Sequence, residues 1–234
     1  MKKVKSTGLS KLEQSVNALN KTESRHFRRF LESALFNQRS DVIRLYDWLL
    51  EQPLEPKART FAQVYPDTAF DAQKMRLVMT YLQQLMERFL AFQEWQNTPG
   101  AYETDLVRAV RHRGLDVHFA EALKTAKEAM ERQPLRNSAY FGRLGLVLWE
   151  EARFESVREP SAVRYLEQLS DNADLTWLTQ KLRYFCLHYA QQIVYRSDHA
   201  LRFRPEIEAM LERHDLLRVP AVAVWYFCLK MLEE

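Results

Sequence analysis

The scarcity of glycine is the feature that most constrains the fold: this chain of 234 residues has 5 glycines, and none lies between Gly8 and Gly100. Tight β-hairpins depend on residues that tolerate positive φ, so a run of hairpins across this stretch is disfavoured. No Gly-rich loop follows a strand-like run, so the fingerprints of nucleotide- and dinucleotide-binding folds are missing. With 47% hydrophobic and 28% charged residues, the composition favours packed helices.

Apolar residues recur at helical spacing along the chain, and polar capping residues or prolines interrupt the pattern at short intervals. The first helix is expected to follow Ser10, and the third is expected to start at Ser40–Asp41. Thr22 or Ser24 is expected to cap the second. The other helices are expected over 57–64, over 71–95, from Thr98–Pro99, from Gly114 to about Gln133, over 137–154, and from Pro160–Ser161, Asp171–Asp174, Pro205 and Pro220.

Most connections between these segments are short, which favours antiparallel neighbours. The sequence therefore predicts an all-α fold of about ten to twelve helices, either an array of antiparallel helical hairpins or an irregular helical bundle. We expect a single all-helical domain over residues 1–234, with a soft division near 96–100 between 1–96 and 97–234. The segment 71–95 is the expected central helix, with these residues facing inward: Met75, Val78, Leu82, Leu85, Phe89 and Phe92.

No membrane-spanning segment is expected, because the longest apolar stretch, Val219–Leu229, is too short to cross a bilayer. The basic start, Met1–Lys5, is followed by polar residues instead of an apolar region, so we expect no secretory signal. Cys186 and Cys228 lie in apolar helical runs, where cysteine usually acts as a small buried hydrophobe. These features predict a cytoplasmic, reduced protein.

Residues 106–148 carry small and large side chains in a regular order: Ala122, Ala126, Ala129, Met130 and Pro134, then Phe141, Leu144–Gly145 and Leu148. This order resembles the tetratricopeptide (TPR) repeat, in which small residues let one helix nest against the other and a proline ends the hairpin. The resemblance implies TPR-like helical hairpins with a concave binding face. Alanines and prolines in other helical-hairpin proteins produce the same order, so both readings stay open.

A second resemblance covers the segment Glu23–Leu49, and it depends on these residues: Phe27, Phe30–Leu31, Ser33, Phe36–Asn37, Val42 and Leu45. The segment resembles the N-terminal part of a family of uncharacterised bacterial all-helical proteins, in which a helix ends in Ser-x-x-Phe-Asn before a second helix begins. The resemblance implies a helical fold and no activity, cofactor or site residue.

Candidate catalytic chemistry is sparse. The only Glu-x-x-His is Glu23–His26, which supplies fewer ligands than a zinc or di-iron site requires, so we predict no metal and no cofactor. Arginine followed after four to six residues by histidine resembles the signature of HEPN-type α-helical ribonucleases, and Arg113–His118 and Arg183–His188 fit it. Such pairs also arise by chance in an arginine-rich chain. An RNA-cleaving enzyme is one alternative, and no catalytic residue is assigned.

Two basic clusters suggest another alternative, nucleic-acid binding through helix faces. The clusters consist of Lys21, Arg25, Arg28 and Arg29 on one side of a helix, and of Arg108, Arg111 and Arg113 near the end of another. The net charge is only +3, and acidic residues lie near both clusters, so ordinary solvated helix faces also explain the basic residues.

Large aromatic residues are enriched at binding hot spots, and several stand in pairs that one buried helix face cannot fully absorb. The candidate partner-binding residues are Tyr140, Phe141, Trp149 and Tyr184. The favoured function is a non-enzymatic scaffold module for an unidentified protein or peptide partner, and assembly into a homo-oligomer is a further possibility.

Overall fold

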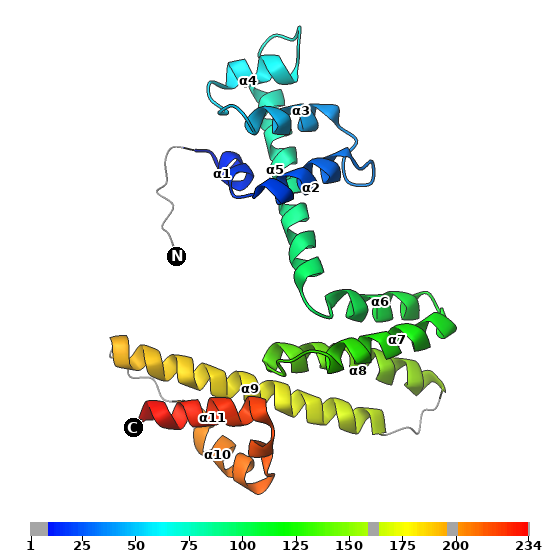
Figure 1. The fold of residues 1–234 in the computed structure, drawn as a ribbon, viewed down its shortest axis with the longest axis vertical. Helices are drawn as coiled ribbons and strands as arrows, with labels where there is room; N and C mark the ends of the chain where they lie inside the picture. Colours follow the sequence, from blue (N-terminus) through cyan, green and yellow to red (C-terminus); the bar gives the residue numbers. More distant parts are fainter. Residues whose placement is uncertain (1–8, 159–163, 196–200, 234) are drawn as a thin grey trace. The chain divides into compact units, whose positions relative to one another are not determined.

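The computed structural model describes residues 9–158, 164–195 and 201–233. These residues form eleven α-helices, one 3-10 helix and no strand, so the predicted all-α class and number of helices are confirmed (Figure 1). The helices are α1 Lys11–Asn17, α2 Lys21–Glu32, α3 Ser40–Leu49, α4 Lys57–Val64, α5 Ala72–Asn97, α6 Ala101–His112, α7 Asp116–Glu131, α8 Ser138–Arg158, α9 Arg164–Tyr195, α10 Arg204–Arg213, η1 Leu216–Arg218 and α11 Pro220–Glu233. The basic start Met1–Lys5 and the predicted helix start Pro160–Ser161 lie outside the described residues.

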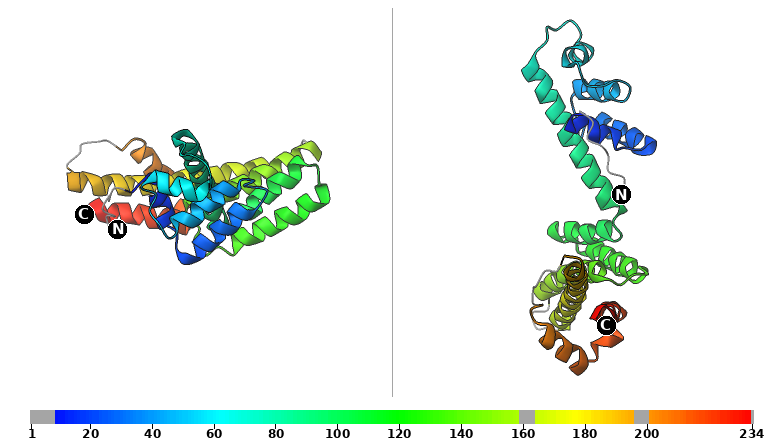
Figure 2. Two further views of the ribbon diagram at one scale, coloured as in Figure 1. Left: turned by 90° about the horizontal axis from the view of Figure 1, so that it is seen from above. Right: turned by 90° about the vertical axis from the view of Figure 1, so that its left-hand side faces the viewer.

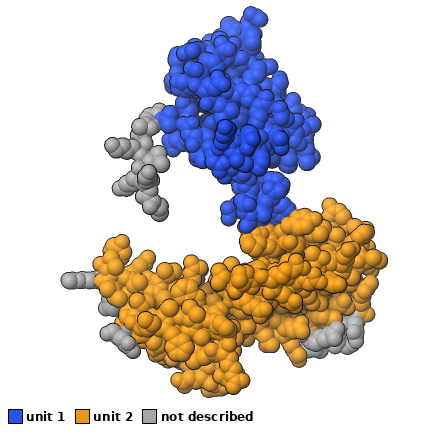
Figure 3. Space-filling model, viewed as in Figure 1, with its two compact units in different colours: residues 1–97 blue, residues 98–234 orange. Residues whose placement is uncertain are grey.

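The chain forms two compact units, which Figure 3 colours separately. Unit 1 is Met1–Asn97 and contains α1 to α5, and unit 2 is Thr98–Glu234 and contains α6 to α11. Each unit has its own buried apolar side chains.

The core of unit 1 is built around the 26-residue helix α5. Phe27 of α2 lies edge-on to Tyr46 of α3, with ring centroids 4.9 Å apart, and 5.1 Å from the ring of Phe89 on α5. The buried face of α5 ends at Phe89. The prediction that Phe92 faces inward was wrong: its side chain is 41% exposed, because it lies beyond this cluster, where it stacks on Trp95 instead.

The first two helices begin with local capping chemistry. Helix α1 follows Ser10, as predicted, and Ser10 caps it in a capping box with Glu13. The prediction that Thr22 or Ser24 caps α2 was wrong, because the side chain of Asn20 accepts hydrogen bonds from the amides of Thr22 and Glu23 at 2.9 and 3.0 Å. The hydroxyl of Ser24 instead lies 2.7 Å from that of Tyr46, where it joins α2 to α3.

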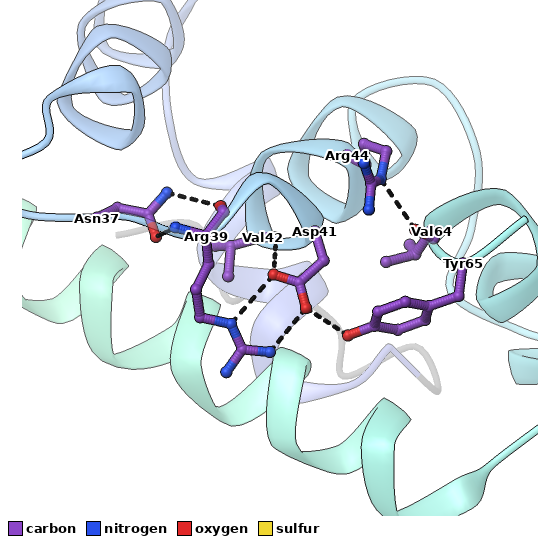
Figure 4. A network of polar contacts seen from close by, with 7 residues as sticks. All are labelled: Asn37, Arg39, Asp41, Val42, Arg44, Val64 and Tyr65. Carbon is purple, nitrogen blue, oxygen red and sulfur yellow. Dashed lines mark hydrogen bonds and ion pairs between the residues drawn. The ribbon is translucent and has the colours of Figure 1, made fainter.

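The turn between α2 and α3 contains the Phe-Asn end of the Ser-x-x-Phe-Asn pattern, and Figure 4 shows the contacts of Asn37. The side-chain Nδ2 of Asn37 donates to the carbonyl oxygens of Leu31 and Arg39, and its side-chain oxygen accepts from the backbone amide of Arg39 at 3.0 Å. The buried Asn37 side chain therefore satisfies the backbone where α2 has ended and α3 has not begun. Phe36 stacks on Phe30 with centroids 4.1 Å apart. Phe36 and Asn37 of the pattern therefore both stabilise the turn.

A second polar network in Figure 4 joins the start of α3 to the end of α4. The carboxylate of Asp41 accepts two hydrogen bonds from Arg39, at 2.7 and 3.1 Å, and one from the hydroxyl of Tyr65 at 2.5 Å. Burial alone raises the pKa of Asp41, but these hydrogen bonds outweigh burial, so its pKa lies below the ordinary value. Burial, followed by the bond to Asp41, raises the pKa of Tyr65 to about 12.

In unit 2, α9 packs against α8 and against α11 (Figures 1 and 2). Two separate helices were predicted here, with Asp171–Asp174 as a cap, and this prediction was wrong: α9 runs unbroken for 32 residues. Asn172 does not cap a helix, because its amide donates to the carbonyl of Phe141 on α8 at 2.9 Å. Gly145 of α8 lies so close that a Cβ there would be 2.9 Å from this amide nitrogen.

The predicted start of α6 at Thr98–Pro99 was also wrong. The helix begins at Ala101 after Gly100, whose φ of 76° is a left-handed conformation that favours glycine. A Cβ at Gly100 would lie 2.9 Å from the side chain of Arg143. Pro205 and Pro220 lie in the first turns of α10 and α11, as predicted.

Candidate partner-binding groove

A groove of about 840 Å³ lies in unit 2 where the starts of α8 and α11 meet. Its size falls in the range of natural ligand-binding clefts. Its lining is mostly apolar and consists of Pro134, Leu135, Arg136, Asn137, Tyr140, Phe141, Leu144, Leu175, Arg218, Val219, Pro220, Ala221, Val224 and Trp225.

The floor of the groove is formed by the first turn of α8. The side chain of Asn137 accepts a hydrogen bond from the amide of Tyr140 at 3.1 Å, which fixes the start of the helix. Tyr140 and Phe141 follow one another on this first turn, and their rings meet edge to face with centroids 5.2 Å apart. Leu144 and, from α9, Leu175 pack against them and extend the apolar surface.

The opposite wall is formed by η1 and the first turns of α11. Val219 and Ala221 pack against the Tyr140–Phe141 pair, whereas Val224 is exposed on the rim. Asp215, with a φ of 52°, precedes η1 and pairs with Arg218. This turn positions the start of α11 beside a part of α8 that lies about 80 residues earlier in the sequence.

Two guanidinium groups border the apolar floor. That of Arg136 lies 5.6 Å from the centre of the Tyr140 ring, and Arg218 is largely exposed on the other wall. The lining residues include no carboxylate, histidine, lysine or cysteine, and the Tyr140 hydroxyl is their only hydroxyl. The groove is therefore suited to holding an apolar group beside a negative charge, and it lacks a pair of groups for proton transfer.

The four predicted partner-binding residues do not form one surface. Tyr140 and Phe141 lie in the groove floor, where each is nine-tenths buried. Trp149 is exposed further along α8, near Arg153, and Tyr184 is exposed on α9. The groove residues that sequence reasoning missed include Leu135, Arg136, Arg218 and Val224. Only the flanking Pro134 and Pro220 indicated that irregular backbone lies there.

The first basic cluster is partly neutralised. Arg28 donates to Asp47 of α3 and to Glu32 of its own helix, both at 2.6 Å. Lys21, Arg25 and Arg29 are exposed at four-residue spacing along α2, and they make no ion pair with any residue that the structure describes. Lys21, Arg25 and Arg29 therefore form a row of three exposed positive charges along α2, which we call the α2 stripe.

The second basic cluster lies at a helix interface. Arg108 and Arg111 of α6 both bond to the carboxylate of Glu150 on α8, which is only 3% exposed. Arg113 donates to the carbonyl of Ala109 in its own helix, at 2.9 Å. The adjacent Glu151 pairs with Lys127 of α7 at 2.6 Å. Arg108 and Arg111 therefore bind a buried carboxylate, an arrangement that the sequence pattern did not predict.

The arginine–histidine pairs do not converge in the described parts of the chain. His118 lines a small pocket between α6 and α7, together with Glu103 and Glu121, and Arg113 is not among the lining residues. Arg183 and His188 lie on the continuous α9, where a separation of five residues directs side chains roughly 140° apart. Glu23, considered above as a metal ligand, accepts from the amide of Asn20 in a capping box.

Other reactive groups are unremarkable in placement. Burial, followed by the charge of Cys228, raises the pKa of Cys186 to about 11, so this thiol stays protonated at neutral pH. Across residues 9–158, 164–195 and 201–233 no group of three or more histidine, cysteine or acidic side chains is placed to hold a metal ion. Within the same ranges, no helix is long and apolar enough to cross a membrane.

No protein-family model, curated protein sequence or solved structure matches this chain.

Proposed function

We propose that this protein is a non-enzymatic binding module that holds a segment of a protein or peptide partner in the groove between α8 and α11. The observation that carries the proposal is the groove itself, an apolar concavity of about 840 Å³ whose lining lacks a pair of groups for acid–base chemistry. The proposal also includes a cytoplasmic, reduced setting, supported by the free thiols of Cys186 and Cys228, and TPR-like hairpin packing, supported by the close approach at Gly145.

The chemistry of the groove suggests what the segment contains. Tyr140, Phe141 and Leu144 offer an apolar floor for one or two large side chains of the partner. Arg136 lines the groove beside this floor, and guanidinium groups pair well with carboxylates. Arg218 also lines the groove, where it already pairs with Asp215. The expected ligand is therefore a short segment with an apolar anchor next to an acidic residue or a C-terminal carboxylate.

Selection of displayed random peptides on the purified chain tests this proposal. Enriched sequences should contain an apolar residue beside a negative charge, and their binding should be lost when the rim is made acidic by V224D. The matched control is V117D, because Val117 is also an exposed valine of unit 2 but lies on α7, outside the groove lining. Peptides that bind V224D and V117D equally well would contradict the proposal.

A second candidate function, nucleic-acid binding, is supported by the exposed α2 stripe of Lys21, Arg25 and Arg29. Three phosphate contacts would give a slope of about −2.7 when the logarithm of the binding constant is plotted against that of the salt concentration. Binding of duplex nucleic acid should flatten to near-zero slope in the variant K21Q/R25Q/R29Q. An unchanged slope in this variant would rule out the stripe as the contact surface.

A further inference from the structure

Helix α9 carries apolar side chains on two opposite faces. One face, with Leu178, Leu182 and Phe185, is buried in the core of unit 2. The N-terminal half of α9 is hydrogen-bonded to α8 through Asn172. The C-terminal half of α9 is hydrogen-bonded to α11 through Cys186, whose thiol lies 3.3 Å from the carbonyl oxygen of Trp225. The face opposite this core is exposed along the helix, as expected of a helix with a second partner.

The exposed face follows a heptad spacing, in which steps of four and three residues alternate. We call it the α9 seam, and its members are Leu166, Ser170, Ala173, Trp177, Gln180, Tyr184, Leu187, Gln191 and Val194, all exposed. The seam spans about four heptads, long enough to form a two-helix coiled coil. Alternation of three and four is the spacing at which one helix packs along another helix, so the expected occupant is helical.

Charges beside the seam change sign along the helix. Glu167 and Asp174 flank its N-terminal half, whereas the half-buried Lys181 and the exposed Arg183 flank its C-terminal half. The ammonium of Lys181 lies 5.2 Å from the centre of the Phe185 ring. In a parallel pair of identical helices, acidic halves would face each other and so would basic halves. In an antiparallel pair, each acidic half faces a basic half, and the helix dipoles oppose one another. The occupant that this charge distribution fits is a second copy of α9 running in the opposite direction.

We propose that two copies of this chain associate through the α9 seam as an antiparallel, two-fold symmetric pair. In the register that fits best, Ala173 packs opposite Tyr184 of the second copy, a small residue against a large one. In this register Asp174 lies beside Lys181 of the second copy. Because the pair is symmetric, this contact between opposite charges occurs twice in the dimer. A shift of one heptad in either direction would place Lys181 beside Lys181 or Asp174 beside Asp174, so charge selects this register.

Sedimentation equilibrium of the full chain tests the association. The natural sequence should form dimers at micromolar concentration, and L187D should be monomeric with unchanged helix content by circular dichroism. The matched control is L77D, because Leu77 is exposed to a similar extent, 57% against 50%, but lies on α5 in unit 1. A monomeric natural sequence, or equal loss of dimer in L77D, would overturn the proposal. L187D should still bind groove peptides, which separates this surface from the groove.

Charge reversal tests orientation and register. D174K and K181E should each weaken self-association by roughly tenfold, since each introduces two like-charge contacts. An equimolar mixture of the two variants should recover the natural affinity as a heterodimer. The lysine introduced at position 174 of one chain then faces the glutamate introduced at position 181 of the other, and the natural Lys181 of the first chain faces the natural Asp174 of the second. If the mixture is as weak as the separate variants, the antiparallel register is wrong.

Discussion

Arg111 of α6 and Glu150 of α8 form an ion pair in which both side chains are largely shielded from solvent. Arg108 completes the arrangement from one turn earlier on α6, with 3.3 Å between its Nε atom and the carboxylate. A carboxylate this deeply buried is stable only with such partners. This pair therefore ties α6 to α8, the helix that supplies the groove floor.

Replacement of Glu150 should be costly. E150Q leaves the buried guanidinium of Arg111 without its counter-charge, so the free energy of unfolding should fall by about 2–3 kcal/mol. Urea denaturation followed by circular dichroism measures the change. E128Q is the control, because Glu128 pairs with Arg132 at the surface, and the expected loss is about 0.5 kcal/mol or less. Equal losses in the two variants would show that burial of Glu150 is unimportant.

Two glycines of α8 should respond in opposite ways to alanine. Nothing lies within 4 Å of a Cβ at Gly142, so G142A should stabilise the helix by about 1 kcal/mol. At Gly145 the new methyl group would displace the Asn172 amide, and the lost buried hydrogen bond to Phe141 should make G145A destabilising by about 1 kcal/mol net. Thermal unfolding of the two variants compares them directly. A stabilising G145A would contradict the close approach of α9.

The hydroxyl of Tyr65 should give unit 1 an alkaline limit. The pKa of Tyr65 is about 12 in the folded chain, against about 10 for an unfolded tyrosine, so the unfolded state loses this proton first. The contribution of the Tyr65 hydroxyl to the free energy of unfolding is therefore fully present below pH 10, and it is lost as the pH rises from about 10 to 12. Y65F should be less stable at pH 7 and should show a shallower decline over that window.

The control for this titration is Y195F, because Tyr195 is an exposed ring on α9. Its stability should follow the natural sequence at every pH. If Y65F and the natural sequence decline in parallel above pH 10, then the hydrogen bond from Tyr65 to Asp41 does not govern the alkaline limit.

Helix positions could be predicted from the sequence where nearby capping residues or prolines mark the helix ends. Ser10 with Glu13, the segment Lys57–Val64, and Pro220 at the start of α11 all follow from residues within a turn of one another. Asn20 with Glu23 is the same signature and was overlooked. The break predicted at Asp171–Asp174 failed for a different reason, because Asn172 serves a tertiary contact that no local pattern reveals.

The candidate groove could be predicted only in part. Tyr140 and Phe141 stood out as adjacent large rings, but the groove residues Val219, just before α11, and Val224, within it, lie about 80 residues later in the sequence. The same limit applies to the basic residues, since Arg108 and Arg111 looked like a phosphate-binding patch until the fold placed Glu150 beside them. Periodicity indicates which face of a helix is buried, and only the packed structure shows which charges meet there.

Amide hydrogen exchange with a saturating concentration of a selected peptide tests the central claim most directly, because it reports where on the full chain the ligand binds. A peptide held in the groove should slow exchange in residues 134–144 and 216–225 and leave the α2 stripe unchanged. Protection confined to α2 or to the α9 seam, with none at the starts of α8 and α11, would contradict the assignment of the groove as the binding site.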